Sequence, residues 1–234
     1  ESDCSIAMAS GSDASKTVSQ VVLLDSDFAS MPRIVNEGRR SINNLQRSAS
    51  LFLVKAMFSA IIAVLFIFLS YDYPFQPIQF TLINAVTIGY PSFILALEPN
   101  RERIRGKFIV NIIKKALPGA LTMVLNIVLL VLVSGFLNFT QEQISTLAVI
   151  ITGYTGLLTL FKVCMPFNTM HIVLFSLMTF IFIAALIFFK PLFAVVGLTL
   201  PMVLVLVPML LVATSLMTAI LHMIEKVIMR KIGD

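Results

Sequence analysis

The run from Phe80 to Asn100 is long and apolar enough to cross a bilayer, yet it carries polar and helix-weakening residues in its middle. Asn84 and Thr87 are followed by Gly89 and by Pro91, which has no backbone N–H. Such a helix is predicted to break, and in lipid the freed carbonyls are tolerated only where protein or a watery cavity covers them. Side-chain oxygens beside a break are typical of a substrate site. The alternative is a kinked packing helix whose Asn and Thr bond a neighbour.

Lys55 lies in the first half of the preceding apolar run. An ammonium within a membrane span costs roughly 2.5 to 3.5 kcal/mol unless it is paired or reaches the interface. Lys55 is therefore a candidate fixed charge or gate, with Glu98 at the end of the next span as its possible partner. The alternative is that Lys55 extends its ammonium to the nearby membrane surface.

The middle of each predicted span holds no acidic residue. Calcium sites generally supply carboxylates among several oxygen ligands. Here the candidate ligands are Asn84, Thr87, Ser59 and the carbonyls around Gly89 and Tyr90. This neutral set gives a weak field for a divalent cation.

Other reactive residue types show no pattern that would support catalysis. His171 and His222 lie near span ends without partners at metal-ligand spacing, and we expect both at the membrane interface. Cys4 and Cys164 are far apart in sequence and are interpreted as plain thiols. The chain has no Walker loop, no Gly-x-Ser-x-Gly and no HExxH, so no catalytic residue is predicted in it.

The composition indicates a polytopic membrane protein, because 58% of the 234 residues are hydrophobic and only 12% are charged. The net charge of +5 does not imply nucleic acid, since the basic residues cluster by membrane side. Runs of about 20 apolar residues predict six membrane helices. These are Ala49–Ser70, Ile78–Leu97, Ala116–Leu137, Ile144–Phe161, Met170–Phe189 and Leu192–Ala213.

The first 31 residues read as soluble. A strand is predicted at Cys4–Met8, then a short helix capped by Ser12 or Asp13, then a strand at Val21–Leu24. This order is typical of the edge of an α/β domain. Asp25 and Asp27 are expected to cap or turn the chain, with a catalytic carboxylate pair as the alternative.

Helical periodicity begins at Met31 and runs without a break into the first apolar run. Nearly all basic residues outside the spans fall on the side of the N-terminal segment, which by the positive-inside rule is the cytoplasm. The predicted location is the plasma membrane with both chain ends cytoplasmic. The basic residues on that side include Arg101, Arg103, Arg105, Lys107, Lys114, Lys115, Lys162, Lys226, Arg230 and Lys231.

Several motifs, in this order, resemble P-type ATPases. Asp3-Cys-Ser-Ile-Ala-Met8 and Val22-Leu-Leu-Asp25-Ser-Asp-Phe28 are similar to the end of the phosphorylation domain, before the fifth membrane helix. Asn84-Ala-Val-Thr87-Ile-Gly89-Tyr-Pro91 resembles the sixth-helix motif, and Cys164-Met-Pro-Phe-Asn168 resembles the link between helices eight and nine. The run from Pro91 to Asn100 looks most like bacterial pumps of the CtpE-like group, for which calcium export has been proposed.

The resemblance implies the C-terminal part of a pump: an all-α membrane region of six helices after a short α/β remnant of a HAD-like phosphorylation domain. Its implied parts are residues 1–31 as the domain edge, 32–70 as stalk and fifth helix, 71–214 as five further helices and 215–234 as a cytoplasmic tail. The actuator, nucleotide and phosphorylation domains would lie upstream in the same polypeptide and bind ATP and Mg²⁺. This chain alone would then lack the phosphorylated Asp.

The chain differs from the calcium pumps at the positions where those pumps have acidic ligands for the ion. Ile88 stands at the sixth-helix Asp position, Ser59 aligns roughly with the fifth-helix Glu, and Leu158 falls near the eighth-helix Glu. The predicted function is nevertheless transport of a cation across the lipid bilayer, calcium first and magnesium second, at a site containing Asn84 and Thr87. The alternatives are a flippase-like pump for a lipidic or bulky substrate, and a passive channel or transporter module.

Overall fold

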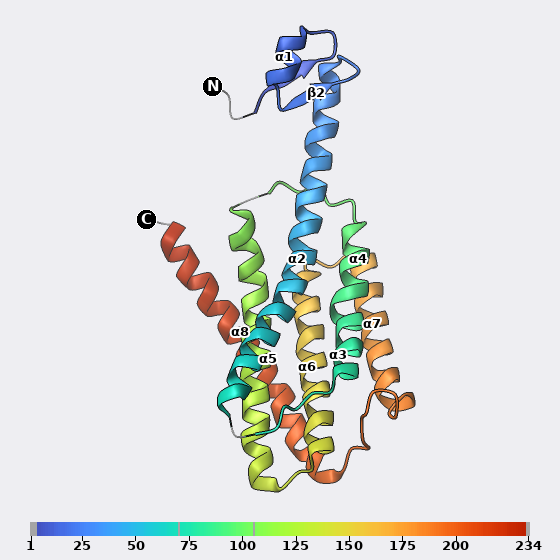
Figure 1. The fold of residues 1–234 in the computed structure, drawn as a ribbon, viewed down its shortest axis with the longest axis vertical. Helices are drawn as coiled ribbons and strands as arrows, with labels where there is room; N and C mark the ends of the chain where they lie inside the picture. The colour runs from blue at the N-terminus through green and yellow to red at the C-terminus, as the bar shows by residue number, and fades with distance from the viewer. Residues whose placement is uncertain (1–3, 70, 105, 233–234) are drawn as a thin grey trace. The chain divides into compact units, whose positions relative to one another are not determined.

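The computed structural model describes residues 4–69, 71–104 and 106–232 (Figure 1). Four places used in the sequence predictions lie outside these residues: the first three residues of the domain edge, the span end at Ser70, Arg105, and the last two residues of the tail. The chain divides into two compact units. One contains residues 1–43 and 99–104, the other residues 44–98 and 105–234, and each is described by itself.

The first unit contains the predicted strand, helix and strand. Strand β1 (Ile6–Met8) pairs in parallel with β2 (Val21–Leu23), and α1 (Asp13–Val18) connects them. Ser12 caps α1 by accepting a hydrogen bond from the Ser15 N–H at 3.2 Å. The predicted order of strand, helix and strand is therefore confirmed within the described residues.

Both aspartates after β2 form local hydrogen bonds, as expected of capping residues. Asp27 caps the 3₁₀-helix η1 (Phe28–Ser30) by accepting from the Ala29 N–H at 2.9 Å. Asp25 accepts from the Ser30 hydroxyl and from the Asp27 N–H, and these bonds lower the pKa of its carboxyl group. The loop before the next helix is thus fixed by side-chain to backbone bonds.

Helix α2 (Met31–Phe68) runs for 38 residues without interruption, which confirms the predicted continuous helix. The remaining elements complete an all-helical membrane region. They are α3 (Pro77–Asn84), the π-helix η2 (Ala85–Gly89), α4 (Tyr90–Ala96), α5 (Phe108–Leu137), α6 (Gln141–Val163), α7 (Thr169–Phe188) and α8 (Leu200–Ile232). In the described part of the chain, six helical stretches are long and apolar enough to cross a membrane.

Two predicted span boundaries are wrong. Helix α5 begins at Phe108 rather than Ala116, because its first turns are helical although Asn111, Lys114 and Lys115 interrupt the apolar run there. The last helix begins at Leu200 rather than Leu192, since residues 190–199 form turns and irregular structure. Pro201 therefore lies in the first turn, where no N–H is needed, and does not kink the helix.

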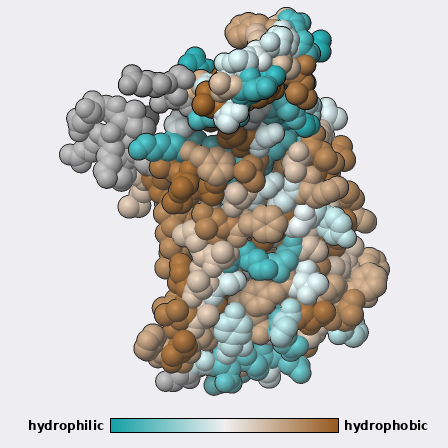
Figure 2. All heavy atoms as spheres, turned by 45° about the horizontal axis from the view of Figure 1, so that its top comes forward, coloured by the Kyte–Doolittle hydropathy of each residue, from teal (hydrophilic) through white to brown (hydrophobic). Residues whose placement is uncertain are grey.

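Helix α6 is the most buried span, with 72% of its apolar window inside the protein against 22% for α8. It packs against α5, α7 and α8 (Figure 1). Large apolar side chains such as Phe136 and Phe188 are exposed on the outside of the helices, and hydrophobic residues cover much of the face shown in Figure 2. The bundle interior is also largely apolar, and apolar side chains on the outer face of the helices suit contact with lipid.

Close packing between α6 and α7 depends on Gly153. A Cβ atom at this position would lie 2.1 Å from Cζ of the buried Phe182 ring. We predict that Gly153→Ala destabilises the protein by about 1–3 kcal/mol, because the ring must leave its position. A lowered melting temperature in detergent, partly restored by Phe182→Leu, is the expected measurement.

The matched control is Gly38→Ala in α2, where a Cβ would meet nothing within 4 Å. Alanine there should leave stability unchanged or raise it by about 0.5–1 kcal/mol, because glycine weakens a helix interior. Equal melting temperatures for the two variants would contradict the packing argument.

Candidate functional site

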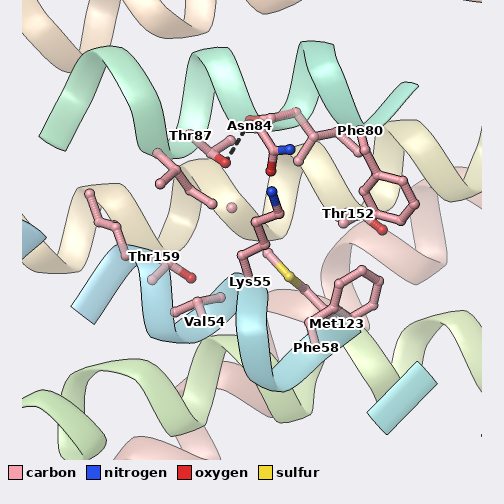
Figure 3. A pocket seen from close by; sticks show the side chains of 13 residues that line it. Val54, Lys55, Phe58, Phe80, Asn84, Thr87, Met123, Thr152 and Thr159 are labelled. Carbon is pink, nitrogen blue, oxygen red and sulfur yellow. Dashed lines mark hydrogen bonds between the residues drawn. The ribbon is translucent and has the colours of Figure 1, made fainter. Parts of the chain in front are cut away.

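A small, partly open cavity lies among α2, α3, the π-helix η2, α5 and α6 (Figure 3). The space open to a water-sized sphere is about 20 Å³, which is the room that one water molecule needs. Its polar lining residues are Lys55, Asn84, Thr87, Thr152 and Thr159. The cavity therefore brings together three of the residues predicted from the sequence: Lys55, Asn84 and Thr87.

The predicted break in the second span is a π-turn rather than an unwound segment. Residues Ala85–Gly89 form the π-helix, and the flanking residues keep right-handed helical dihedral angles. Pro91 at the start of α4 supplies no N–H and its ring crowds the preceding turn. The wider turn accommodates the proline without breaking the helix, as π-bulges do at many functional sites.

Thr87 presents its hydroxyl oxygen to the cavity from this π-turn. Its hydroxyl donates to the Ile83 carbonyl at 2.7 Å, so the lone pairs of Oγ1 remain available as ligands (Figure 3). Helix α6 approaches the turn closely at Gly156, where a Cβ would lie 2.7 Å from Cγ2 of Thr87. The glycine thus allows the threonine to face α6.

Lys55 and Asn84 point toward each other across the cavity (Figure 3). The lysine is half-buried and its ammonium is directed at the amide of Asn84. Among the described residues that line the cavity, none is acidic. The site is therefore a neutral oxygen set with one fixed positive charge, which disfavours a multiply charged ion near the ammonium.

The other predicted site residues lie elsewhere. Ser59 is half-buried and does not line this cavity. Gly89 lines a separate surface hollow with Ala85, Tyr90 and Phe93, and Pro91 is buried in α4. Gly89 and Pro91 therefore shape the helix rather than contact the cavity.

Glu98 does not meet Lys55, the partner suggested by the sequence. Its carboxylate forms a buried ion pair with Arg47 of α2 and lies 3.0 Å from Nε2 of His171. The Asn168 amide also donates to it at 2.9 Å. This group of Arg47, Glu98, Asn168 and His171, here called the buried charge cluster, joins α2 to the end of α4 and the start of α7.

The sequence did not predict the buried charge cluster. The sequence predicted His171 at the membrane interface and gave no role to Arg47, yet these residues are only 1% and 6% exposed. One signal in the sequence could have indicated it: the polar residues of Asn43-Asn44-Leu-Gln-Arg47 directly precede the apolar part of the same helix. Asn44 is bonded as well, since its amide donates to the Ala96 and Glu98 carbonyls at 3.0 and 2.7 Å.

The two thiols differ in environment. Cys4 is exposed, whereas Cys164, just after α6, is buried. Burial raises the pKa of the Cys164 thiol to about 11, partly opposed by Arg47. Within the described residues, no three His, Cys, Asp or Glu side chains form a group that could hold a metal ion.

The fold and the cavity define a polytopic α-helical membrane protein with a polar site beside an irregular helix. Comparison with curated proteins identifies its relatives. The chain is 35% identical over 182 residues to a probable cation-transporting ATPase of Streptococcus pneumoniae, covering 74% of this chain and 23% of that protein. It is 44% identical over 133 residues to the calcium-transporting ATPase CtpE of Mycolicibacterium smegmatis, covering 53% and 17%.

The CtpE protein of Mycobacterium tuberculosis is 38% identical over 182 residues, covering 72% of this chain and 23% of the relative. No family model matches the chain. The similarities confirm the predicted kinship with the CtpE-like P-type ATPases. It spans less than a quarter of the length of these relatives.

The buried charge cluster yields a stability prediction. Glu98→Gln should destabilise the protein by about 3–5 kcal/mol, because it leaves the Arg47 guanidinium buried without a counter-charge. Arg47→Met combined with Glu98→Gln should cost less than the sum of the single changes. Melting temperatures of the four proteins in detergent measure this coupling.

The control is Glu37→Gln, which removes the same charge from a pair with Arg40 on the exposed surface of α2. That change should alter stability by less than about 1 kcal/mol. Strictly additive effects of the Arg47 and Glu98 changes would show that the two side chains are not coupled.

Proposed function

We propose that this chain is the membrane-transport part of a P-type ATPase that moves a cation across the plasma membrane, with the cavity at Lys55, Asn84 and Thr87 as the transport site. The observation that carries the proposal is the convergence of these three side chains at the π-turn of η2. The relatives' names, which include calcium-transporting ATPases, favour calcium as the ion. Magnesium is the second candidate in this proposal.

In this proposal, energy comes from ATP hydrolysis through an aspartyl phosphate formed in other domains of the same polypeptide, which also bind Mg²⁺. Residues 1–31 are the edge of the phosphorylation domain, 32–70 the stalk and first span, 71–214 the other spans and 215–234 a cytoplasmic tail. Both ends of the chain are cytoplasmic, which is supported by the basic residues outside the spans on that side.

Within the site, Asn84 Oδ1 and Thr87 Oγ1 act as ligands, together with backbone carbonyls near the π-turn. Lys55 acts as a fixed charge that takes the place of a counter-ion or keeps a second cation out. Because like charges repel strongly in a low-dielectric interior, one bound cation is the most that this cavity holds beside the ammonium.

A flippase-like pump is the second candidate, and the neutral lining of the cavity favours it. A lipid phosphate or other anionic group would be attracted by Lys55, where a cation is repelled. The cavity itself has room for about one water molecule, so a bulky substrate would require a different arrangement of these helices.

The first test is the ATPase activity of the purified full-length protein, titrated after chelation with calcium, magnesium, manganese, potassium and lipid. We expect saturable stimulation by micromolar calcium. Asn84→Ala and Thr87→Val should each weaken the apparent affinity by about tenfold, since each removes one ligand oxygen. Thr218→Val is the matched control, because this exposed threonine of α8 also bonds its own helix backbone.

Stimulation by a lipid or bulky amine and by no cation would overturn the cation proposal. Unchanged calcium stimulation in both Asn84→Ala and Thr87→Val would remove these residues from the ligand set.

Lys55→Met distinguishes the two candidate functions directly. Methionine keeps the length and apolar stem of the lysine but removes its charge. If a cation binds in the cavity, the loss of repulsion should increase its apparent affinity by about tenfold or more. If an anionic headgroup is the substrate, the same change should weaken stimulation by lipid. The measurement is the same ATPase titration, and an unchanged response to every ligand would place the substrate away from Lys55.

A further inference from the structure

Three buried side-chain oxygens next to the cavity have no hydrogen-bond partner among the described residues. They are Thr122 Oγ1 and Asn126 Oδ1 of α5 and Thr152 Oγ1 of α6. All three residues are at most 1% exposed. Buried polar atoms are almost always paired, so such a group calls for an explanation such as a bound water or ion.

The packing of α5 against α6 places these oxygens on facing surfaces. Gly119 of α5 touches Thr159 of α6, since a Cβ on the glycine would lie 2.4 Å from Oγ1 of Thr159. The two helices are antiparallel neighbours joined by a short link. Asn126 lies seven residues after Gly119 on α5, and Thr152 lies seven residues before Thr159 on α6. Because the helices are antiparallel, both steps of about two turns, or about 10 Å, run in the same direction in space.

The register therefore sets Asn126 across from Thr152 in the interface between the two helices. Thr122 lies on the same face of α5, four residues before Asn126. Thr152 and Met123 both line the cavity (Figure 3). Of the three residues with unpaired oxygens, Thr152 lines the cavity, whereas Thr122 and Asn126 lie on α5 on either side of the lining residue Met123.

The orientation of the Asn126 amide is fixed by the hydrogen bond of its nitrogen, Nδ2. Its Nδ2 donates to the Thr122 carbonyl at 2.9 Å, which leaves Oδ1 as the free end. An amide oxygen and hydroxyl oxygens that have no hydrogen-bond partner can accept a bond from a water molecule or coordinate a cation. At the other side of the cavity, the Asn84 amide already faces the Lys55 ammonium (Figure 3).

We propose that Asn126 and Thr152, assisted by Thr122, form a second neutral-oxygen subsite that takes the transported cation away from Lys55. The inference rests on the proposed function, cation transport through this cavity, and adds α5 to the elements that bind the ion. Repulsion from the ammonium favours this part of the cavity for a positive charge. The Lys55 ammonium is then the fixed positive charge of the cavity, and the transported cation binds and leaves at the subsite.

The decisive variant is Asn126→Asp in the full-length protein, which keeps the side-chain shape and adds a negative charge at the subsite. Equilibrium binding of Mn²⁺ and of Ca²⁺, measured without ATP, should tighten by about tenfold or more. Wild-type affinity in Asn126→Asp would contradict the subsite. Asn138→Asp is the matched control, because it makes the same change at the exposed C-cap of the same helix and should leave binding unchanged.

Thr152→Val keeps the proposal testable if the aspartate variant fails to fold. Valine has the shape of threonine without its hydroxyl, and we expect Ca²⁺ binding to weaken by about threefold to tenfold. The control is Thr218→Val, with the melting temperature of every variant measured in detergent. Wild-type affinity in Thr152→Val overturns the subsite.

The outcomes separate this proposal from the proposed function. If Asn84→Ala abolishes cation stimulation while Asn126→Asp and Thr152→Val bind like the wild type, the transport site stands and the subsite is wrong. If no cation stimulates the wild-type ATPase, cation transport is wrong, whatever the binding experiment gives. Tighter Mn²⁺ binding in Asn126→Asp alone, without the loss in Thr152→Val, also overturns the subsite, because an added carboxylate would then be creating the affinity.

Discussion

The membrane region depends on one constraint: in lipid, every backbone polar group must find a partner inside the protein. The second span meets this constraint at Pro91 by widening into the π-turn Ala85–Gly89 instead of unwinding. The Thr87 hydroxyl donates to the Ile83 carbonyl within the same stretch. The polar atoms of this helix are therefore directed inward, where Lys55 of α2 and the threonines of α6 meet them.

The same constraint explains why two positive charges of α2, the buried Arg47 and the half-buried Lys55, have different surroundings. Arg47 is neutralised by Glu98 and held in the buried charge cluster, which suits a structural role. Lys55, two turns further along the helix, faces a neutral amide in a cavity without acidic lining among the described residues. A charge that is kept in the membrane without a counter-charge costs free energy, and this makes Lys55 the more informative of the two for function.

Patterns that depend on local chemistry were predictable. Strand β1, the Ser12 cap, strand β2 and the long α2 follow from turn residues, capping residues and helical periodicity. The grouping of Lys55, Asn84 and Thr87 was also predictable, because polar residues within apolar runs face the interior of a helix bundle. The start of α8 was not, since Leu192–Thr199 is as apolar as a helix and only its tertiary surroundings make it irregular.

Pairings between distant segments could not be read from spacing. The sequence places Glu98 and Lys55 at similar depths in the membrane. Depth alone does not decide whether Glu98 pairs with Arg47, Lys55 or His171. The choice depends on the rotation of α2 about its axis, which places Arg47 toward α4 and α7. In the same way, the facing of Asn126 and Thr152 follows from the Gly119–Thr159 contact, which no single-sequence pattern reveals.

Helix α2 carries both the buried charge cluster and the cavity lysine, and this limits how the site can change. Arg47 and Asn44 bind the end of α4 through the Glu98 carboxylate and the Ala96 and Glu98 carbonyls. Sliding α2 past α4 would break a buried ion pair, at a cost of about 3–5 kcal/mol. Displacements of α2 are therefore transmitted to α4 and to the π-turn that directly precedes α4 in the chain. Because α2 is held to the end of α4 by these contacts, we expect the distance between Lys55 and Asn84 to change through rotation or bending of α2. Independent movement of α2 and α3 is not expected.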